Sequence, residues 1–277
     1  MSMRLIYITR DPSVAAVAQD VGVDWIFVDL EYHGKDQRQA ARDTVISRHS
    51  LADVEIIRGV LTTSQLLVRI NPLGPWSAEE IDAVIAAGAD VVMLPYFKTA
   101  EEVAGFLELV AGRARTCLLV ETMGAIADLD RILGLPGIDF VHVGLNDIHI
   151  ERNTTSMFEF FADGSMDAVA ARLRASNHVF GIGGMARIGT LVPPAERILA
   201  EHLRLGSTGV ILSRSFCSPD QARDTDDFRA LFTQLVAEVR KQEAWLAEQP
   251  LEFFESNRRQ LIGEIDQVVE QIRSRKT

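Results

Sequence analysis

The chain has 277 residues, of which 47% are hydrophobic, so it can bury a sizeable core within one barrel-sized domain. It carries 28 Lys and Arg against 39 Asp and Glu, a net charge of −11, which argues against a nucleic acid or an anionic membrane as a partner. The two cysteines are too few for a disulfide framework, and no apolar run approaches the roughly 20 residues of a membrane span, so we expect a cytoplasmic protein.

Strand-like and helix-like segments alternate along most of the chain. Apolar runs predict eight strands, in order at residues 4–9, 25–31, 66–71, 91–97, 116–121, 140–145, 179–184 and 209–216. Helical patterns fill the intervals between them, and two of these helices begin with a predicted capping box, Ser77 with Glu80 and Thr99 with Glu102. Strands that alternate with crossover helices imply a parallel sheet, and eight of them imply a closed (β/α)8 TIM barrel.

The pattern changes after the eighth strand. Residues 227–249 and 252–274 predict two long helices separated by Pro250. Only the first is needed to complete the barrel. We therefore expect a single domain over residues 1–277, with a barrel over about residues 4–248 and a helical extension over about residues 251–275. The apolar stripe of the extension needs a surface to pack on. That surface is either its own barrel or another subunit.

Polar residues gather where the predicted strands end. In barrels of this type the active site lies at the carboxyl ends of the strands. The polar residues and glycines at or just after those ends are Asp29, Glu31, Arg69, Asn71, Glu121, Gly144, Asn146, Asp147, Gly183, Gly184, Arg187, Ser213 and Arg214. Carboxylates that lie this close repel one another unless arginines or a cation balance them.

Glu121 and Asp147 are the candidate metal ligands. They end neighbouring apolar runs, and oxygen ligands without a cysteine or histidine cluster favour Mg²⁺ or Mn²⁺. A chelating 2-oxo acid would fill two further positions, and Arg69 could pair with its carboxylate or enolate oxygen. Backbone N–H groups near Leu145 to Asp147 could also hold an anion. The competing interpretation is that these acids only cap helices or form salt bridges.

The histidines leave alternatives open. His33 follows the second strand and is either a proton shuttle or a solvated loop residue. His142 lies in the middle of the sixth strand, where we expect a packed core residue. His149 follows Asp147 closely, and its direction is open.

Several motifs, in this order, resemble one known family. They are VDLE, LLVRINPLG, AGADVVMLPYFKTAEEV, VET and GLND. The chain over about residues 4–217 is similar to the family of 4-hydroxy-2-oxoheptanedioate aldolase and the citrate lyase β-subunit. The resemblance implies a modified (β/α)8 barrel whose last helix is often exchanged between subunits, in a homo-oligomeric trimer or hexamer. It also implies a divalent metal ion that stabilises a pyruvate-type or acetyl-type enolate while a carbon–carbon bond breaks or forms.

The resemblance also implies roles for single residues. Glu121 looks like the first metal ligand and Asp147 like the second. Arg69 looks like the arginine that contacts the oxo and carboxylate oxygens of the substrate. Glu31 matches an acid shared by both branches of the family, and Asp29 matches the acid two residues before it.

Two positions depart from the family pattern. The aldolase branch has a catalytic His directly after the shared Glu, and the citrate lyase branch has an Asp there, whereas this chain has Tyr32 followed by His33. The general base is therefore open between His33, Tyr32 and a metal-bound water. Tyr96 stands where members that use thioesters usually have Lys, which leans away from a CoA substrate.

The sequence therefore predicts a divalent-metal-dependent carbon–carbon lyase, an aldolase acting on a 2-oxo acid and an aldehyde. Its predicted catalytic residues are Glu31, His33 and Arg69. Its predicted substrate-binding residues are Arg69, Gly144, Asn146 and Asp147, and its predicted metal ligands are Glu121 and Asp147. The alternatives are a citrate- or malyl-CoA-type thioester lyase and a non-catalytic barrel that retains a metal- or anion-binding pocket.

Overall fold

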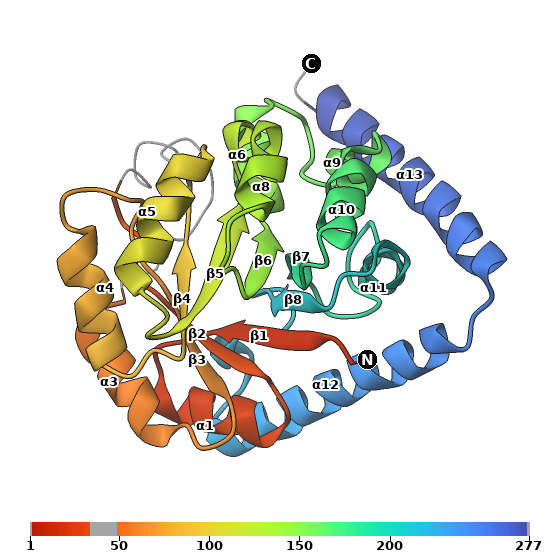
Figure 1. The fold of residues 1–277 in the computed structure, drawn as a ribbon. Helices are drawn as coiled ribbons and strands as arrows, with labels where there is room; N and C mark the ends of the chain where they lie inside the picture. Colours follow the sequence, from red (N-terminus) through yellow and green to blue (C-terminus); the bar gives the residue numbers. More distant parts are fainter. Residues whose placement is uncertain (1, 34–48, 276–277) are drawn as a thin grey trace.

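A computed structural model of the protein describes residues 2–33 and 49–275. Eight parallel strands form a closed barrel in which each strand pairs with its neighbours in chain order and β8 pairs with β1 (Figure 1). The predicted (β/α)8 barrel is confirmed. The strands are β1 Arg4–Ile8, β2 Trp25–Asp29, β3 Gln65–Arg69, β4 Val91–Leu94, β5 Arg115–Val120, β6 Phe140–Val143, β7 Phe180–Met185 and β8 Gly209–Leu212.

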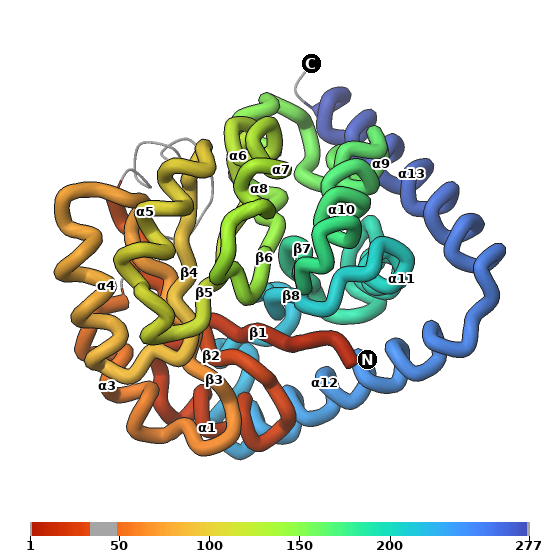
Figure 2. The backbone as a smooth tube through the Cα atoms, viewed as in Figure 1, coloured from red at the N-terminus to blue at the C-terminus, as the bar shows by residue number. Residues whose placement is uncertain are grey.

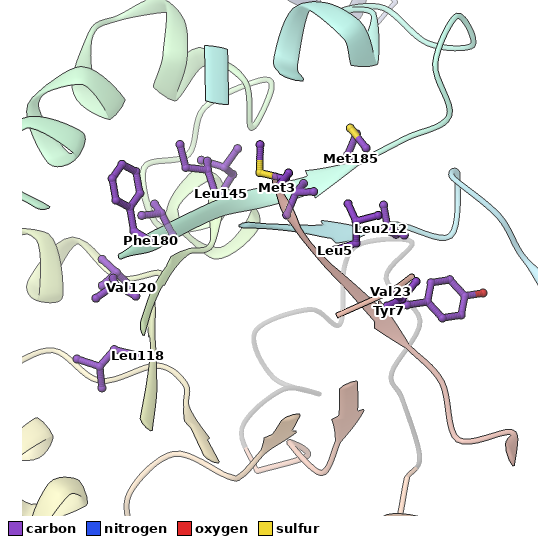
Figure 3. Close-up of a cluster of buried hydrophobic side chains, with 14 of the residues drawn as sticks. Met3, Leu5, Tyr7, Val23, Leu118, Val120, Leu145, Phe180, Met185 and Leu212 are labelled. Carbon is purple, nitrogen blue, oxygen red and sulfur yellow. The ribbon is translucent and has the colours of Figure 1, made fainter. Parts of the chain in front are cut away.

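The strands are apolar on both faces because both faces are covered. In β5, Cys117 and Leu119 belong to the cluster inside the barrel, whereas Leu118 and Val120 pack against the surrounding helices. Figure 3 shows part of the outer layer, with Val120 among its labelled side chains. This two-sided burial explains why the strands read as continuous apolar runs in the sequence.

Helices surround the barrel (Figures 1 and 2). They are α1 Pro12–Asp20, α3 Leu51–Val60, α4 Ser77–Ala86, α5 Ala100–Val110, α6 Met123–Ala127, α7 Leu129–Leu133, α8 Leu145–Glu151, α9 Glu159–Ala162, α10 Ser165–Ala175, α11 Ala195–Leu205, the short 3₁₀ helix η1 Pro219–Gln221, α12 Thr225–Ala247 and α13 Leu251–Ser274. The sequence pattern predicts one helix between β5 and β6, but the structure has two short ones, α6 and α7. The chain leaves helical geometry at Asp128, which lies between them. The Asp128 carboxylate accepts a hydrogen bond from the backbone N–H of Ala100 (2.7 Å).

One of the two predicted capping boxes is wrong. Thr99 and Glu102 form theirs: each side chain accepts from the other residue's backbone N–H, at 3.4 Å for Thr99 Oγ1 and 3.1 Å for Glu102 Oε2. Ser77 instead lies inside α4, and its hydroxyl accepts from Gly74 N–H (2.9 Å). Glu80 accepts from Asn71 Nδ2 (2.7 Å), so contacts with the segment before the helix take both side chains.

The C-terminal helix packs on its own barrel. α13 lies along α11 and α9, as Figure 1 also shows. Leu261 and Ile265 are buried in this contact, and Arg197 of α11 forms an ion pair with Glu264 (2.7 Å). The apolar stripe of the extension is thus covered within the chain. Assembly into a trimer or hexamer stays a prediction.

No helix within residues 2–33 and 49–275 is both long enough and apolar enough to cross a membrane.

Truncating Ile265 tests whether α13 is an integral part of the fold. Ile265 is fully buried, so Ile265→Ala should lower the free energy of unfolding by about 2–5 kcal/mol through lost burial and the cavity left behind. Leu251→Ala on the same helix is the control, because that side chain is 71% exposed and its loss should cost less than about 0.5 kcal/mol. Urea denaturation measures both, and equal effects would show that α13 does not dock as described.

Candidate active site

Most of the predicted site residues meet at the carboxyl mouth of the barrel. Asp29 ends β2 and Arg69 ends β3, Glu121 follows β5 directly, and Gly144 follows β6. Asp147 lies in the first turn of α8, three residues beyond Gly144. Because all eight strands are parallel, their carboxyl ends face the same side, which brings these groups together.

Arg69 is held by two buried carboxylates. Its backbone is in register with Asp29 on the neighbouring strand, and its Nε and Nη2 donate to the two oxygens of Asp29, each at 2.8 Å. Nη1 lies 3.3 Å from Glu31 Oε2. Burial disfavours the charged guanidinium, but Asp29 and Glu31 more than offset this effect and raise the pKa of Arg69. Arg69 is therefore a fixed cation that presents a defined edge.

Glu121 and Asp147 share one corner of the site. Burial, the nearby Asp147 and Glu31 raise the pKa of Glu121 well above its ordinary value, and Arg69 only partly opposes them. The side chains of Glu121 and Asp147 are also within hydrogen-bonding distance. Two carboxyl groups can hydrogen-bond only when a proton lies between them. The pair therefore demands positive charge, from a proton or from a cation.

The backbone around Glu121 is shaped to place its carboxylate. The N–H of Tyr96 donates to Glu121 Oε1 (3.1 Å), and Tyr96 adopts a left-handed conformation (φ 52°), which is uncommon for a residue with a side chain. On the other side, Gly144 leaves room: a Cβ there would lie 2.9 Å from Glu121 Cβ and 3.1 Å from Oε2. Gly144 thus contributes space beside the carboxylate.

A cavity of about 260 Å³ opens between these groups. Its polar lining includes Asp29, Arg69, Glu121, Asn146, Asp147 and Arg214, and its apolar lining includes Ile8, Phe27, Met93, Leu119, Met157 and Ile211. The volume is below the usual range of drug-sized pockets, about 300–1,000 Å³. A small, polar substrate suits it. The predicted substrate residues Arg69, Gly144, Asn146 and Asp147 all line this cavity.

His33 and Glu31 are not among the residues that line the cavity. The His33 ring stacks on Trp76 (4.2 Å between ring centres) and contacts the ring of Tyr32 (4.3 Å). The backbone N–H groups of Tyr32 and His33 both donate to Asn71 Oδ1, at 3.0 and 2.9 Å. The chain after β2 is thus tied to the end of β3. A role for His33 as the base stays a prediction.

The expectation that His142 is packed in the core is confirmed, since the side chain is only 1% exposed. Sequence reasoning missed that it also lines the cavity. The sequence did hold a signal for this: His142 lies two residues after Phe140, whose side chain points into the barrel, and alternate residues of a strand point to the same side.

Arg187 and Arg214 were both expected at the mouth of the barrel. Arg214 lines the cavity, whereas Arg187 does not and instead donates to Gln221 Oε1 (3.0 Å).

Comparison with known proteins identifies the family. The profile of the HpcH/HpaI aldolase/citrate lyase family matches residues 5–182. The chain belongs to this family. The resemblance seen in the sequence motifs is thereby confirmed, and the family's name covers enzymes that make or break carbon–carbon bonds.

One curated relative is a hydroxypyruvate/pyruvate aldolase from Roseovarius nubinhibens. It is 28% identical over 169 aligned residues, which cover 50% of this chain and 60% of the relative. The match therefore spans less than two thirds of the relative's length.

Two solved structures of family members share the fold. An HpcH/HpaI aldolase from Desulfitobacterium hafniense superposes with a TM-score of 0.59 at 16% identity, covering 76% of this chain and 86% of that one. An HpcH/HpaI aldolase/citrate lyase family protein from Burkholderia cenocepacia gives a TM-score of 0.61 at 18% identity, covering 86% and 95%. At these identities the likeness speaks for the barrel alone.

A methyl group at Gly144 should be costly. Gly144→Ala forces Glu121 to shift and should lower the free energy of unfolding by about 1–3 kcal/mol. Gly59→Ala is the matched control, because Gly59 is exposed in α3 with no atom near the added methyl, and alanine there should stabilise by about 0.5–1 kcal/mol. Urea denaturation should therefore show changes of opposite sign in the free energy of unfolding for the two variants. A Gly144→Ala variant as stable as wild type would contradict the close packing against Glu121.

The raised pKa of Glu121 predicts a pH dependence of stability. The unfolded carboxyl titrates near pH 4.3, whereas the folded one holds its proton to higher pH. Between these two values the unfolded chain has released the proton that the folded chain retains. With a chelator present, the free energy of unfolding of wild type should therefore fall by up to about 1.4 kcal/mol for each unit by which the pH rises through that window, relative to Glu121→Gln. Denaturation from pH 4 to 8 measures this. If wild type and Glu121→Gln showed the same pH dependence, the raised pKa of Glu121 would be contradicted. Glu55→Gln, which replaces an exposed acid on α3, is the control.

Proposed function

We propose that this protein is a divalent-metal-dependent aldolase that breaks or forms a carbon–carbon bond next to a 2-oxo acid through a pyruvate-type enolate. The observation that carries the proposal is the meeting of the buried Glu121 and the partly exposed Asp147 beside the Arg69 guanidinium. A small cavity opens directly onto these three groups. Family membership and the aldolase named among its relatives support the same class of reaction.

The residues present fit a divalent ion. Burial and mutual repulsion give the Glu121–Asp147 pair an unmet demand for positive charge, and hard carboxylate oxygens suit Mg²⁺ or Mn²⁺. Among residues 2–33 and 49–275, no group of three or more His, Cys, Asp or Glu side chains is arranged to hold a metal ion. Two protein carboxylates, with substrate and water completing the shell, match the way Mg²⁺ is commonly bound. When bound, the ion would stabilise the negative charge that develops on the 2-oxo group.

Arg69 would orient the acid. Three of its five N–H donors are directed to Asp29 and Glu31, which leaves two for a ligand in the cavity. Because Asp29 and Glu31 fix the guanidinium, its hydrogen bonds to a carboxylate or enolate oxygen require no rearrangement during the reaction. Gly144 and Asn146 would line the opposite side of the bound acid.

A base must also move the proton of the hydroxyl on the bond that breaks. His33, two residues after the buried Glu31, is our first candidate, and Tyr32 and a metal-bound water are the alternatives. Glu31 would act through Arg69, which it contacts. The second substrate would be an aldehyde small enough for the cavity. We further propose a homo-oligomeric, cytoplasmic enzyme, in line with the family resemblance.

Removal of the metal or of either ligand should abolish activity. With a 4-hydroxy-2-oxo acid and Mg²⁺ or Mn²⁺, wild type should release pyruvate, whereas chelator, Glu121→Gln or Asp147→Asn should each reduce kcat/KM by at least about 10³-fold. A coupled assay for pyruvate measures this. Glu55→Gln, an exposed acid on α3, is the control and should keep full activity.

Three outcomes would count against the proposal. Turnover that resists chelation would exclude metal assistance. Activity that requires CoA thioesters would favour the citrate- or malyl-CoA-type alternative. No turnover with any aldehyde, combined with retained metal binding, would favour a barrel that only binds.

A further inference from the structure

His142 is held in one orientation inside the barrel. The side chain is only 1% exposed, and its Nε2 lies 3.0 Å from the carbonyl oxygen of Gly183. A carbonyl oxygen can only accept, so Nε2 carries the proton and Nδ1 does not. Burial lowers the pKa of His142 to about 4, which keeps the ring neutral at physiological pH. Nδ1 is buried without a hydrogen-bond partner among the described residues.

Glycines on β7 make room for this ring. Gly181 is in register with His142 on the neighbouring strand, and a Cβ on Gly181 would lie 2.7 Å from Nδ1. The ring therefore fills space that a side chain on β7 would otherwise occupy. A group larger than the imidazole would therefore press directly on β7.

The hydrogen-bonded carbonyl lies where β7 departs from regular pairing. The register between β7 and β8 breaks between Gly181 and Gly184, and Gly183 has a positive φ of 48°. Such a break rotates a peptide group out of the ladder, so its carbonyl needs another donor. His142 supplies that donor. Both Gly183 and Gly184 line the cavity, so this irregular stretch forms one of its walls.

We propose that His142 is a positioning residue: its Nε2–H holds the Gly183 carbonyl and thereby fixes the β7 wall against which the substrate acid rests. The identity of the substrate in this inference rests on the proposed function. The contact between His142 and Gly183 does not. Because His142 occupies the Gly183 carbonyl oxygen, that oxygen does not face an anionic ligand without a hydrogen bond. A wall of this kind touches the acid equally in the ground state and the transition state, so it acts on binding more than on the chemical step.

Two amide variants separate the two ring nitrogens. In His142→Gln, the amide nitrogen is as many bonds from Cβ as Nε2 is, and it can reach the Gly183 carbonyl. In His142→Asn, the amide nitrogen takes the place of Nδ1 and falls short. Both variants bring a neutral amide of similar polarity, so they differ mainly in whether the contact survives.

The kinetic readout is exchange of the methyl protons of pyruvate into D₂O with Mg²⁺, followed by proton NMR, together with the Kd of pyruvate by calorimetry. We expect His142→Gln to stay within about threefold of wild type, and His142→Asn to raise the pyruvate KM and Kd at least about tenfold with kcat nearly unchanged. Equal behaviour of the two variants, or a loss confined to kcat, would overturn the role. So would a wild type that does not bind pyruvate. A wild type that binds pyruvate without exchanging its protons would contradict the proposed function and leave the Kd values to decide the role of His142.

A second measurement does not depend on activity or on the stability of the Asn variant. Nitrogen NMR of histidine-labelled wild type reports which ring nitrogen is protonated, and the His142→Gln spectrum assigns the signal. We expect His142 to carry its proton on Nε2 alone. A proton on Nδ1 would overturn the proposed contact.

Discussion

The structure depends on one unfavourable arrangement, the placement of two carboxyl groups side by side at the mouth of the barrel. Glu121 is buried and directly follows β5, whereas Asp147 is partly exposed and lies in the first turn of α8. Burial, together with the nearby Asp147 and Glu31, raises the pKa of Glu121. Such an arrangement costs free energy unless a positive charge offsets it. Much of the surrounding geometry maintains it: the left-handed backbone of Tyr96, which aims an N–H at Glu121, and the missing side chain at Gly144.

A second group of charges is paired within the protein. Arg69 lies between Asp29 and Glu31, which hold its guanidinium rigidly. The mouth of the barrel is therefore divided into an acid–arginine cluster, in which Arg69 keeps N–H donors for a ligand, and the Glu121–Asp147 acid pair. A 2-oxo acid has a carboxylate that suits the first and an oxo oxygen that suits a cation held by the second. This division is the physical basis of the proposed aldolase chemistry.

The sequence predicted the barrel and most of the polar residues that line its mouth because both follow from local pattern. Apolar runs covered on both faces identify the strands, and parallel strands bring Glu121 and Arg69 to one mouth whatever the loops do. Features set by individual side-chain hydrogen bonds escaped prediction. Ser77 and Glu80 have the spacing of a capping box, yet both are used outside α4. Likewise, the pattern placed His142 in the core, but not its hydrogen bond to an irregular part of β7.

The most direct test of the account is the position of a metal ion in crystals soaked with Mn²⁺ and pyruvate. Anomalous scattering would locate the ion independently of any assumption about its ligands. We expect one Mn²⁺ bound by both Glu121 and Asp147, with pyruvate chelating it and its carboxylate within reach of Arg69. An ion elsewhere, or pyruvate bound away from both acids, would contradict the proposed metal site.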